Sequence, residues 1–228
     1  MSYRERDKEV IPILPRQRQE NERSELREKR RLSIIQAAIS IFTQQGFEKA
    51  TMQEIAKAAS LGVATVFRYF PKKEHLIVAV ASHIVQSEVV IFEKIVLGDG
   101  TCYEKLNEIF DTLIFFQQAE HQQNSKLIEA FECYVALSKE PVEHIELYQT
   151  EYSKIIALFT ELAALGEQDH SVRASSNSVN ILLTMMNVFG TFSKKMSMLE
   201  GIDAFNTRVD PSEQFNLLKS LFLESLKP

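Results

Sequence analysis

Residues 51–73 read TMQEIAKAASLGVATVFRYFPKK and predict two short helices joined by a tight turn. Thr51 and Glu54 form a capping box, in which each side chain bonds a backbone N–H of the other residue, so a helix begins there. Residues 60–62 supply the turn. The second helix ends before Pro71, because proline disfavours helical geometry in the residue that precedes it. This arrangement is typical of a helix-turn-helix, which reads DNA.

The second helix of the pair has two faces. Val66 and Phe70 lie four residues apart, so both point into the core. The remaining positions face away from the core, and a recognition helix presents such positions to base edges and phosphates. We expect Arg68 to read a base.

Segments on both sides make the pattern specific. AAISIFTQQGFEKAT precedes it at residues 37–51, and RYFPKKEHL completes it at residues 68–76. Residues 28–76 together resemble the amino-terminal domain of the tetracycline repressor (TetR) family. The resemblance implies phosphate contacts from Thr51, Phe67, Tyr69 and Lys73 and base contacts from Val63, Ala64, Thr65 and Arg68. Gly62 and Lys72 complete the expected DNA-binding set.

Three positions depart from the family pattern. Gly62 stands where a Ser is frequent, Val63 where a Lys is common, and Phe67 where a Tyr hydroxyl often meets a phosphate. Two polar contacts and one charge are therefore absent, and we expect this helix to anchor the DNA backbone weakly. More of the binding then depends on the residues before the first helix and on Arg68, Lys72 and Lys73.

The alternative is a helical hairpin in an ordinary all-helical protein, with Phe67 and Tyr69 as core aromatics. The preceding segment argues against it, since apolar residues repeat there at helical spacing and Gly46 suits a left-handed C-cap. Three helices would then share one small core. The repeating residues are Ile34, Ile35, Ala38, Ile41 and Phe42.

Charge separates two parts of the chain. Residues 1–75 carry 15 Lys or Arg and 10 Asp or Glu, whereas residues 76–228 carry 11 and 21. The electrostatic footprint of DNA binding belongs to a domain rather than to a whole chain. Cations cluster at Arg23, Arg27, Lys29, Arg30 and Arg31. They either meet the DNA backbone or an adjacent minor groove or form a solvated helix face with Glu20, Glu22, Glu25 and Glu28, and both interpretations stay open.

Composition predicts an all-α protein. The 228 residues are 45% hydrophobic, enough for a sizeable core, and strand-like alternation is not sustained after Pro71. We expect a charged arm at 1–23 with an apolar VIPILP patch at 10–15, a three-helix DNA-binding domain at 24–75, and a larger helical ligand-binding and dimerisation domain at 76–228. Its helices are expected at 73–96, 103–119, 125–138, 142–165, 175–199 and 211–226.

No hydrophobic run long enough to span a membrane is expected, and the amino terminus lacks the apolar stretch of a secretory signal. Cys102 and Cys133 have no metal-ligand spacing around them. We therefore expect a cytoplasmic protein with no membrane partner and no metal.

The last two helices are apolar over much of their surface, which favours a subunit interface. In the family that the chain resembles, these helices form a four-helix dimer interface. The candidate interface residues are Val179, Leu183, Phe215, Leu218 and Phe222. A homodimer would place two recognition helices about one turn of DNA apart on a palindromic operator.

The middle helices carry an aromatic and thioether-rich interior, which is either ordinary core or an effector pocket like that of the resembling family. The candidate lining is Phe115, Phe131, Tyr134, Phe159, Met185, Met186 and Phe189. Such a lining favours a small hydrophobic or aromatic effector. The resemblance implies that this ligand shifts the dimer toward a helix spacing that no longer fits DNA.

An enzyme is disfavoured, because the chain has no glycine-rich phosphate loop, no GxSxG and no HExxH, and its five histidines are dispersed. We expect no cofactor. A DNA-binding protein of this fold that is controlled by a protein partner, or has no small-molecule effector, stays open. Activation of transcription stays open as well as repression.

Overall fold

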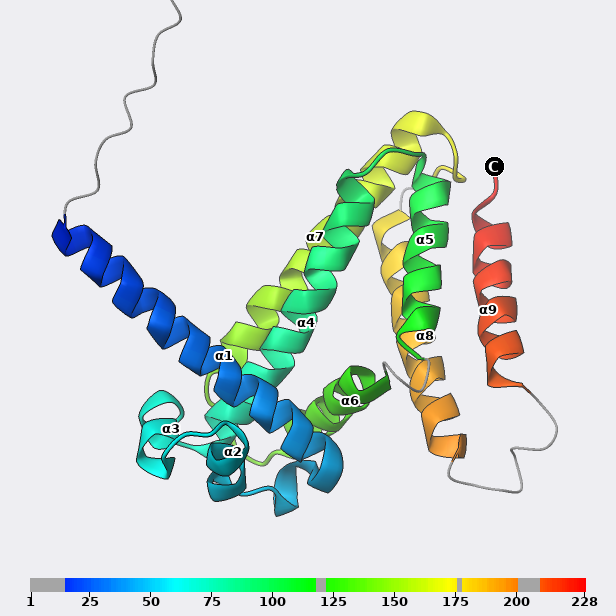
Figure 1. Cartoon of the computed structure of the whole chain (residues 1–228). Coiled ribbons are helices and arrows are strands. Elements are labelled where there is room, and N and C mark those ends of the chain that lie inside the picture. The colour runs from blue at the N-terminus through cyan, green and yellow to red at the C-terminus, as the bar shows by residue number, and fades with distance from the viewer. Residues whose placement is uncertain (1–14, 118–121, 176–177, 201–209) are drawn as a thin grey trace, which may run out of the picture.

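A computed structural model describes residues 15–117, 122–175, 178–200 and 210–228 of the chain. Within these ranges the chain forms nine helices and no strand, as the sequence predicts (Figure 1). Residues 1–14, which include most of the apolar patch of the expected arm, lie outside them. The helices are α1 Pro15–Lys49, α2 Met52–Ala58, α3 Val63–Tyr69, α4 Lys73–Leu97, α5 Cys102–Phe115, α6 Gln122–Leu137, α7 Ile145–Asp169, α8 Ser178–Glu200 and α9 Pro211–Leu226.

α1 begins earlier than the sequence suggests. Residues 15–23, expected in the arm, belong to this helix. Glu, Gln and Arg are good helix formers and dominate this segment, and proline is favoured at the first helical position. Near the other end Gly46 has φ 75° and ψ 169°, so the helix is interrupted at the position expected for its glycine cap.

α2 and α3 form the predicted helix-turn-helix. Thr51 Oγ1 accepts a hydrogen bond from Glu54 N at 3.2 Å, and the Glu54 carboxylate accepts one from Thr51 N at 3.0 Å, which confirms the capping box. Ser60 adopts a left-handed conformation with φ 56° in the turn. Val66 and Phe70 are buried, as their spacing predicts.

The core beneath these helices draws on more than the three amino-terminal helices. It joins Phe42 and Val66 to the first half of α4 as far as Ile84, and to Leu127 and Phe131 of α6. The DNA-binding domain therefore shares its core with α6, and no division between cores falls at residue 75.

A second core fills the rest of the chain. α4 and α7 pack side by side, and α5, α8 and α9 lie beside this pair (Figure 1). The ring centroid of Phe215 on α9 lies 5.5 Å from that of Phe189 and 5.2 Å from that of Phe192, both on α8. Such aromatic contacts fix α9 against α8 within one chain.

α4 corrects the expectation that no segment could span a membrane. By length and composition alone it is apolar enough to do so, and 56% of its most apolar window is buried inside the protein. A helix at the centre of a folded domain passes the same test. α4 packs against α1, α5, α6 and α7, so its apolar character is explained by the two cores.

The two cysteines lie in different surroundings. Cys102 is buried at the start of α5, where its thiol donates a hydrogen bond to the Leu162 carbonyl at 3.1 Å, and burial raises the pKa of this thiol to about 12. Cys133 is exposed on α6.

Candidate functional site

The outer face of α3 is available to DNA. Its expected contact residues fall into two groups, with Val63, Ala64, Phe67 and Arg68 exposed and Thr65 and Tyr69 half-buried. The apolar side chains of Val63 and Phe67 are 36% and 40% exposed, so they face solvent rather than the core. An exposed apolar and cationic helix face of this kind suits base edges, including the thymine methyl group.

The N-cap residues of α2 and α3 differ in the hydrogen bonds that they supply. The Thr51 hydroxyl donates a hydrogen bond to Glu54 Oε2 at 2.7 Å, which together with the backbone bond lowers the pKa of this carboxyl. Gly62 is the N-cap of α3 and supplies no side-chain hydrogen bond. The sequence indicated that Gly62 lacks a polar side chain for DNA. The structure shows that α3 also lacks a side-chain cap at this position.

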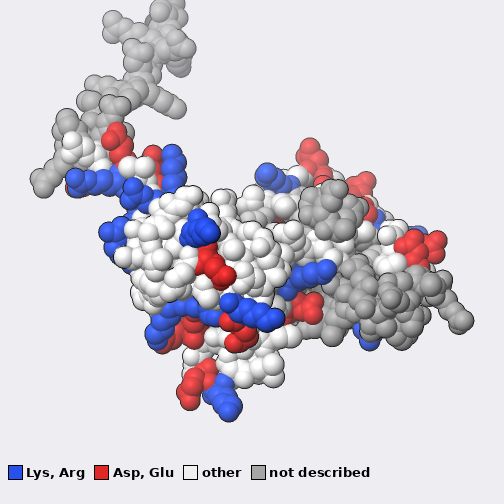
Figure 2. All heavy atoms as spheres, turned by 60° about the horizontal axis from the view of Figure 1, so that its bottom comes forward, with Lys and Arg blue, Asp and Glu red and all other residues white. Residues whose placement is uncertain are grey.

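A groove of about 340 Å³ lies between α1 and α3. Arg23, Arg27 and Arg30 follow one another along α1 and line it together with Arg68 and Tyr69 of α3. None of the described residues that line the groove is acidic, which gives it the charge that attracts DNA phosphates. Figure 2 shows Lys and Arg side chains, with Asp and Glu side chains among them, on the part of the surface beside the grey amino-terminal atoms.

The remaining cations of this cluster lie elsewhere. The Arg31 guanidinium lies 5.8 Å from the centroid of the Phe70 ring, so it covers the core. Lys29 is exposed outside the groove. The cluster that the sequence left undecided is thus divided between a groove face and other surfaces.

Lys72 and Lys73 are both engaged within the protein. The Lys73 ammonium donates hydrogen bonds to the carbonyl oxygens of Phe47 at 2.7 Å, Glu48 at 3.1 Å and Ala50 at 3.2 Å. It therefore satisfies the carbonyl groups that follow the interruption of α1. Lys72 pairs with Glu143, and this hydrogen bond raises the pKa of Lys72.

Glu143, which lies between α6 and α7, is bonded to residues at the start of α4. Its carboxylate accepts hydrogen bonds from Lys72 and from His75 Nε2, and its backbone N–H donates to Glu74 Oε1 at 2.6 Å. His75, Glu143 and His144 offer ligand atoms that lie within 4.8 Å of one another. The Lys72 ammonium already shares this carboxylate, and its positive charge disfavours a metal ion at the same place.

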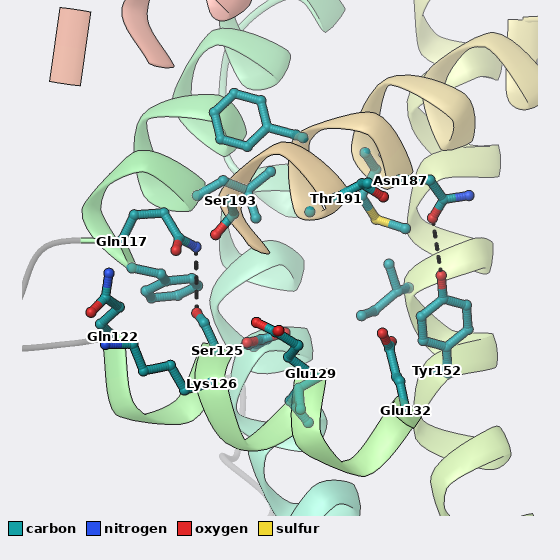
Figure 3. A pocket seen from close by; sticks show the side chains of 18 of the residues that line it. Gln117, Gln122, Ser125, Lys126, Glu129, Glu132, Tyr152, Asn187, Thr191 and Ser193 are labelled. Atoms are coloured by element: carbon teal, nitrogen blue, oxygen red, sulfur yellow. Dashed lines mark hydrogen bonds between the residues drawn. The ribbon is translucent and has the colours of Figure 1, made fainter. Parts of the chain in front are cut away.

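A second candidate site is a partly open cavity of about 350 Å³ lined by residues of α4, α5, α6, α7 and α8. Its apolar wall includes Phe92, Phe116, Ile128, Ile155, Met186 and Phe189. Figure 3 shows the polar wall, in which Gln117 Nε2 donates to Ser125 Oγ at 3.4 Å and the Tyr152 hydroxyl donates to Asn187 Oδ1 at 3.4 Å. This volume lies within the range of small-molecule sites.

Carboxylates distinguish this cavity. Of the described residues, Glu88 of α4, Glu129 and Glu132 of α6 and the cation Lys126 line it. Burial, followed by the nearby Glu132 carboxylate, raises the pKa of Glu88 to about 7. These carboxylates were not among the residues predicted from the sequence, although a signal existed, because Glu88 interrupts the buried stripe of α4 between Val85 and Phe92.

The seven residues expected around a pocket are not all brought together. Met186 and Phe189 line the cavity. Phe115 is 45% exposed, and its neighbour Phe116 faces the cavity instead. The other four pack elsewhere: Phe159 and Met185 lie in the second core, Phe131 in the first, and Tyr134 beside Phe47 and Glu74 at the domain junction.

The expected interface residues mostly serve the chain's own core. Phe215 is buried, and Val179, Leu183, Leu218 and Phe222 pack against the second core. Other apolar side chains of the same helices are open to solvent: Val188 is 42% exposed, Leu217 60% and Leu221 59%. The predicted apolar stripe of α9 is therefore the face that packs against the second core.

Comparison with known proteins adds to this geometry. Residues 34–80 match the family model described as bacterial regulatory proteins, tetR family. The transcriptional repressor KstR of Mycolicibacterium smegmatis is 29% identical over 122 residues, which span 54% of this chain and 60%, less than two thirds, of that repressor. The nicotine-responsive transcriptional repressor HdnoR of Paenarthrobacter nicotinovorans is 26% identical over 159 residues, 69% of this chain and 80% of that one.

The fold of the chain agrees with that of a solved transcriptional regulator. The transcriptional regulator FadR from Bacillus subtilis, solved in complex with stearoyl-CoA, superposes with a TM-score of 0.66 at 14% identity, over 86% of this chain and 98% of that one. At this identity the likeness shows the fold. The relatives are named as transcriptional regulators, which are not enzymes. The capped helix-turn-helix, the exposed face of α3, the match of residues 34–80 to the tetR-family model and the shared fold together support a TetR-type transcriptional regulator.

Proposed function

We propose that the protein is a homodimeric repressor that binds a palindromic operator and leaves it when a small molecule occupies the cavity. The observation that carries the DNA-binding part is the arginine-lined groove beside the exposed face of α3. Its partner is double-stranded DNA, and its place is the cytoplasm, where bacterial DNA lies.

The contacts with DNA divide by chemistry. Arg68 reads a base edge, and the apolar groups of Val63, Ala64 and Thr65 lie against neighbouring bases. Arg23, Arg27 and Arg30 neutralise phosphates or enter an adjacent minor groove. Thr51, Gly62, Phe67 and Tyr69 lie where the backbone passes, whereas Lys72 and Lys73 position the start of α4.

A second copy of the chain covers the exposed apolar side chains of α8 and α9. Leu217 and Leu221 lie one turn apart on α9, and Val188 of α8 lines an open groove with Thr184 and Thr191. One short recognition helix discriminates few bases, while two of them read both halves of a palindrome. The apolar patch and the need for two helices support the dimer.

α6 is the element that links the cavity to DNA binding. One of its faces contributes Leu127 and Phe131 to the core of the DNA-binding domain, and another presents Glu129 and Glu132 to the cavity. A ligand that binds one position of α6 better than another shifts the population toward that position. The shared core transmits this shift to α3.

A cavity of this size supports a small-molecule effector over control by a protein partner, which a tightly filled domain would favour. The relatives point the same way, since one repressor is named as nicotine-responsive and one structure holds stearoyl-CoA. Repression rather than activation is supported by the names of these relatives, which are called repressors.

Selection of bound sequences from random duplex DNA by the purified protein tests this function. A palindromic site with a steep salt dependence is expected, and Arg68→Ala should lose base preference at one position in each half-site. Enrichment of a single half-site, or of no sequence, would contradict the dimeric repressor.

A further inference from the structure

We infer that a second copy of the chain completes the cavity, so that the ligand of the cavity lies between two chains. The cavity reaches one side of α8, and that side adjoins the face of α8 that the proposed dimer covers. This inference rests on the proposed function and adds to it, because it assigns part of the effector site to the second copy. Two observations carry it: the residues that the cavity shares with the outer groove of α8, and the lack of charge on this helix.

Two residues of α8 form a rim between the cavity and the outer groove. Asn187 and Thr191 lie one turn apart and are exposed, and each lines both the cavity and a groove of about 450 Å³ on the outer face of α8. Figure 3 shows both residues at one side of the cavity, where the Tyr152 hydroxyl donates a hydrogen bond to Asn187 Oδ1 at 3.4 Å. The cavity and the outer groove therefore meet along this rim.

Gly190 leaves space in the same wall. It lines the cavity, is exposed, and falls with Asn187 and Thr191 within about 100° around the helix. Among the residues that the structure describes, none places an atom within 4 Å of where a Cβ atom of Gly190 would lie, apart from the helix backbone around it. Glycine is unfavourable inside a helix. At this position it keeps the mouth of the cavity open toward the outer face of α8.

Charge is absent from most of this helix. Residues 178–193 contain no Asp, Glu, Lys or Arg, although Thr184, Asn187, Val188 and Thr191 are exposed. A surface helix ordinarily carries charged residues on the face opposite the core. An exposed face without charge therefore indicates that another surface covers it.

A second copy is the occupant that the charges favour. Two copies related by a twofold axis present the same patch to each other, so a charged patch would meet like charge. Residues 76–228 carry 21 Asp or Glu against 11 Lys or Arg, so this part of the chain on average repels a copy of itself. The uncharged face of α8, with the exposed Leu217 and Leu221 of α9, avoids this repulsion.

A ligand in such a site touches both chains. Met186 and Phe189 contact its apolar body, whereas Asn187 and Thr191 offer hydrogen bonds to a polar group at the rim. Because the second copy covers this end, the ligand binds the dimer more tightly than one chain, and by linkage it strengthens the dimer by the same factor. Contacts with both chains also favour one mutual orientation of the copies, which sets the spacing of the two recognition helices.

Fluorescence titration of prodan tests the shared site. Prodan is a neutral naphthalene with a carbonyl group, and its emission reports the polarity of its surroundings. The Leu221→Glu variant should be a monomer, and Leu221 is not among the residues that line the cavity. The dimer should bind prodan about tenfold more tightly than this monomer and with emission at shorter wavelength. Equal affinity and emission in both forms would overturn the inference.

Leu217→Glu, one turn away on α9, repeats the comparison where Leu221→Glu does not fold. A dimer that survives both substitutions would place the interface away from α9 and overturn the inference as well. Sedimentation with and without prodan measures the linkage, since prodan should lower the dissociation constant of the dimer by the factor seen in the titration.

A covalent label tests the same geometry without a free ligand. In a Cys133→Ser chain, Gly190→Cys takes the polarity-sensitive thiol reagent acrylodan, because Cys102 is buried. Its emission should move to longer wavelength when Leu221→Glu removes the second copy. Sedimentation checks that the labelled chain is a dimer, and Asn187→Cys replaces Gly190→Cys where it is not.

The control for this label is native Cys133 of α6, which is exposed. Acrylodan on Cys133 should emit at the same wavelength with and without Leu221→Glu. If the label on α8 also reports the same surroundings in monomer and dimer, the second copy does not cover the mouth of the cavity and the inference fails, even if prodan binds to neither form.

Gly190→Val tests whether the space at Gly190 serves the ligand. It should weaken prodan binding by the dimer about tenfold, because its methyl groups fill the mouth of the cavity. Thr184→Val, which lies in the outer groove and not in the cavity, keeps the side-chain size and should leave binding unchanged. Unchanged binding in Gly190→Val, or dissociation of its dimer, would assign this glycine to helix packing and contradict the inference.

Selection of operator DNA separates this inference from the proposed function. A chain that dimerises and selects a palindrome, but whose Gly190 label is indifferent to the second copy, would keep the proposed function and lose the shared site. A chain that shows the shared site but selects no palindrome would keep the site and lose the repressor.

Discussion

Glu143 accepts a hydrogen bond from His75 Nε2 at 2.7 Å, across 68 residues of sequence. His75 lies in the first turn of α4, directly after the recognition helix, whereas Glu143 lies in the connection between α6 and α7. The hydrogen bond from Lys72, followed by that from His75, lowers the pKa of Glu143 to about 2. This carboxylate therefore ties the carboxyl end of the helix-turn-helix to the element that follows α6.

Glu143→Gln should reduce stability in a pH-dependent way. Because the folded pKa of Glu143 lies below its ordinary value of 4.5, its contribution is present above pH 4.5 and is lost as pH falls toward 2. The difference in urea midpoint between the parent and this variant should be largest at pH 7 and disappear near pH 2. Glu140→Gln, an exposed carboxylate in the same connection, is the control, and a difference that is the same at every pH would refute the assignment.

Lys73→Met should destabilise the protein without weakening its phosphate contacts. The substitution leaves three carbonyl groups without their ammonium donor, which costs about 1–3 kcal/mol in free energy of unfolding. The salt dependence of operator binding should keep its slope. A slope reduced by about one unit would instead place Lys73 on a phosphate.

Arg27→Ala should weaken operator binding by about 1 kcal/mol or more and reduce the salt slope by about one. Lys29→Ala removes the same charge two residues away, outside the groove, and should have a smaller effect. Electrophoretic or fluorescence titration at several salt concentrations measures both. Equal losses in the two variants would favour a diffuse basic surface over the groove.

Leu221→Glu should convert the proposed dimer to a folded monomer, because it places a charge in the apolar patch that the proposed second copy covers. Phe215→Ala should act differently, since this side chain is buried against Phe189 and Phe192, and its loss costs about 3–5 kcal/mol of folding free energy. Sedimentation and thermal unfolding distinguish the outcomes. A Leu221→Glu chain that remains dimeric would place the interface elsewhere.

Gly62→Ser should stabilise α3 by about 0.2–0.5 kcal/mol, because a serine hydroxyl can cap the first turn. Its Cβ would fit, since the nearest atom, Thr65 Oγ1, lies 4.0 Å away. Gly46→Ser is the opposite case: φ there is 75°, and a side chain costs about 1–2 kcal/mol. Urea unfolding of both variants measures these changes, and a destabilised Gly62→Ser would show that the cap does not form.

Local patterns in the sequence predicted the helices and the helix-turn-helix well. The capping box of Thr51 and Glu54 and the burial of Val66 and Phe70 depend on residues within a few positions of one another. The structure confirms both predictions. Helix ends depend on competing propensities, which is why residues 15–23 joined α1. The contact residues on α3 remain predictions, although their exposure suits the role.

Side-chain roles that depend on distant elements could not be predicted. Phe115 ends α5 and Phe116 is its C-cap with helical geometry, so the two side chains differ by about 100° in direction, and hydrophobicity alone does not show which one faces a cavity. Lys72 meets Glu143 across 71 residues. The apolar stripe of Phe215 and Phe222 was visible, but the core of one chain and a second copy compete for such a stripe. In the packed fold Phe215 is buried in the core, whereas Phe222 is half-buried against it.

The contrast between the two cysteines provides a reporter without mutation. A thiolate reacts with maleimides and nitroxide reagents, so exposed Cys133 accepts a label while Cys102, buried and with its pKa near 12, stays protected. Cys133 lies on α6, the helix shared by the cavity and the DNA-binding core. In a homodimer the wild-type chain therefore carries a matched pair of spin labels, and the distance between them records the movement of α6 as ligand and operator are exchanged.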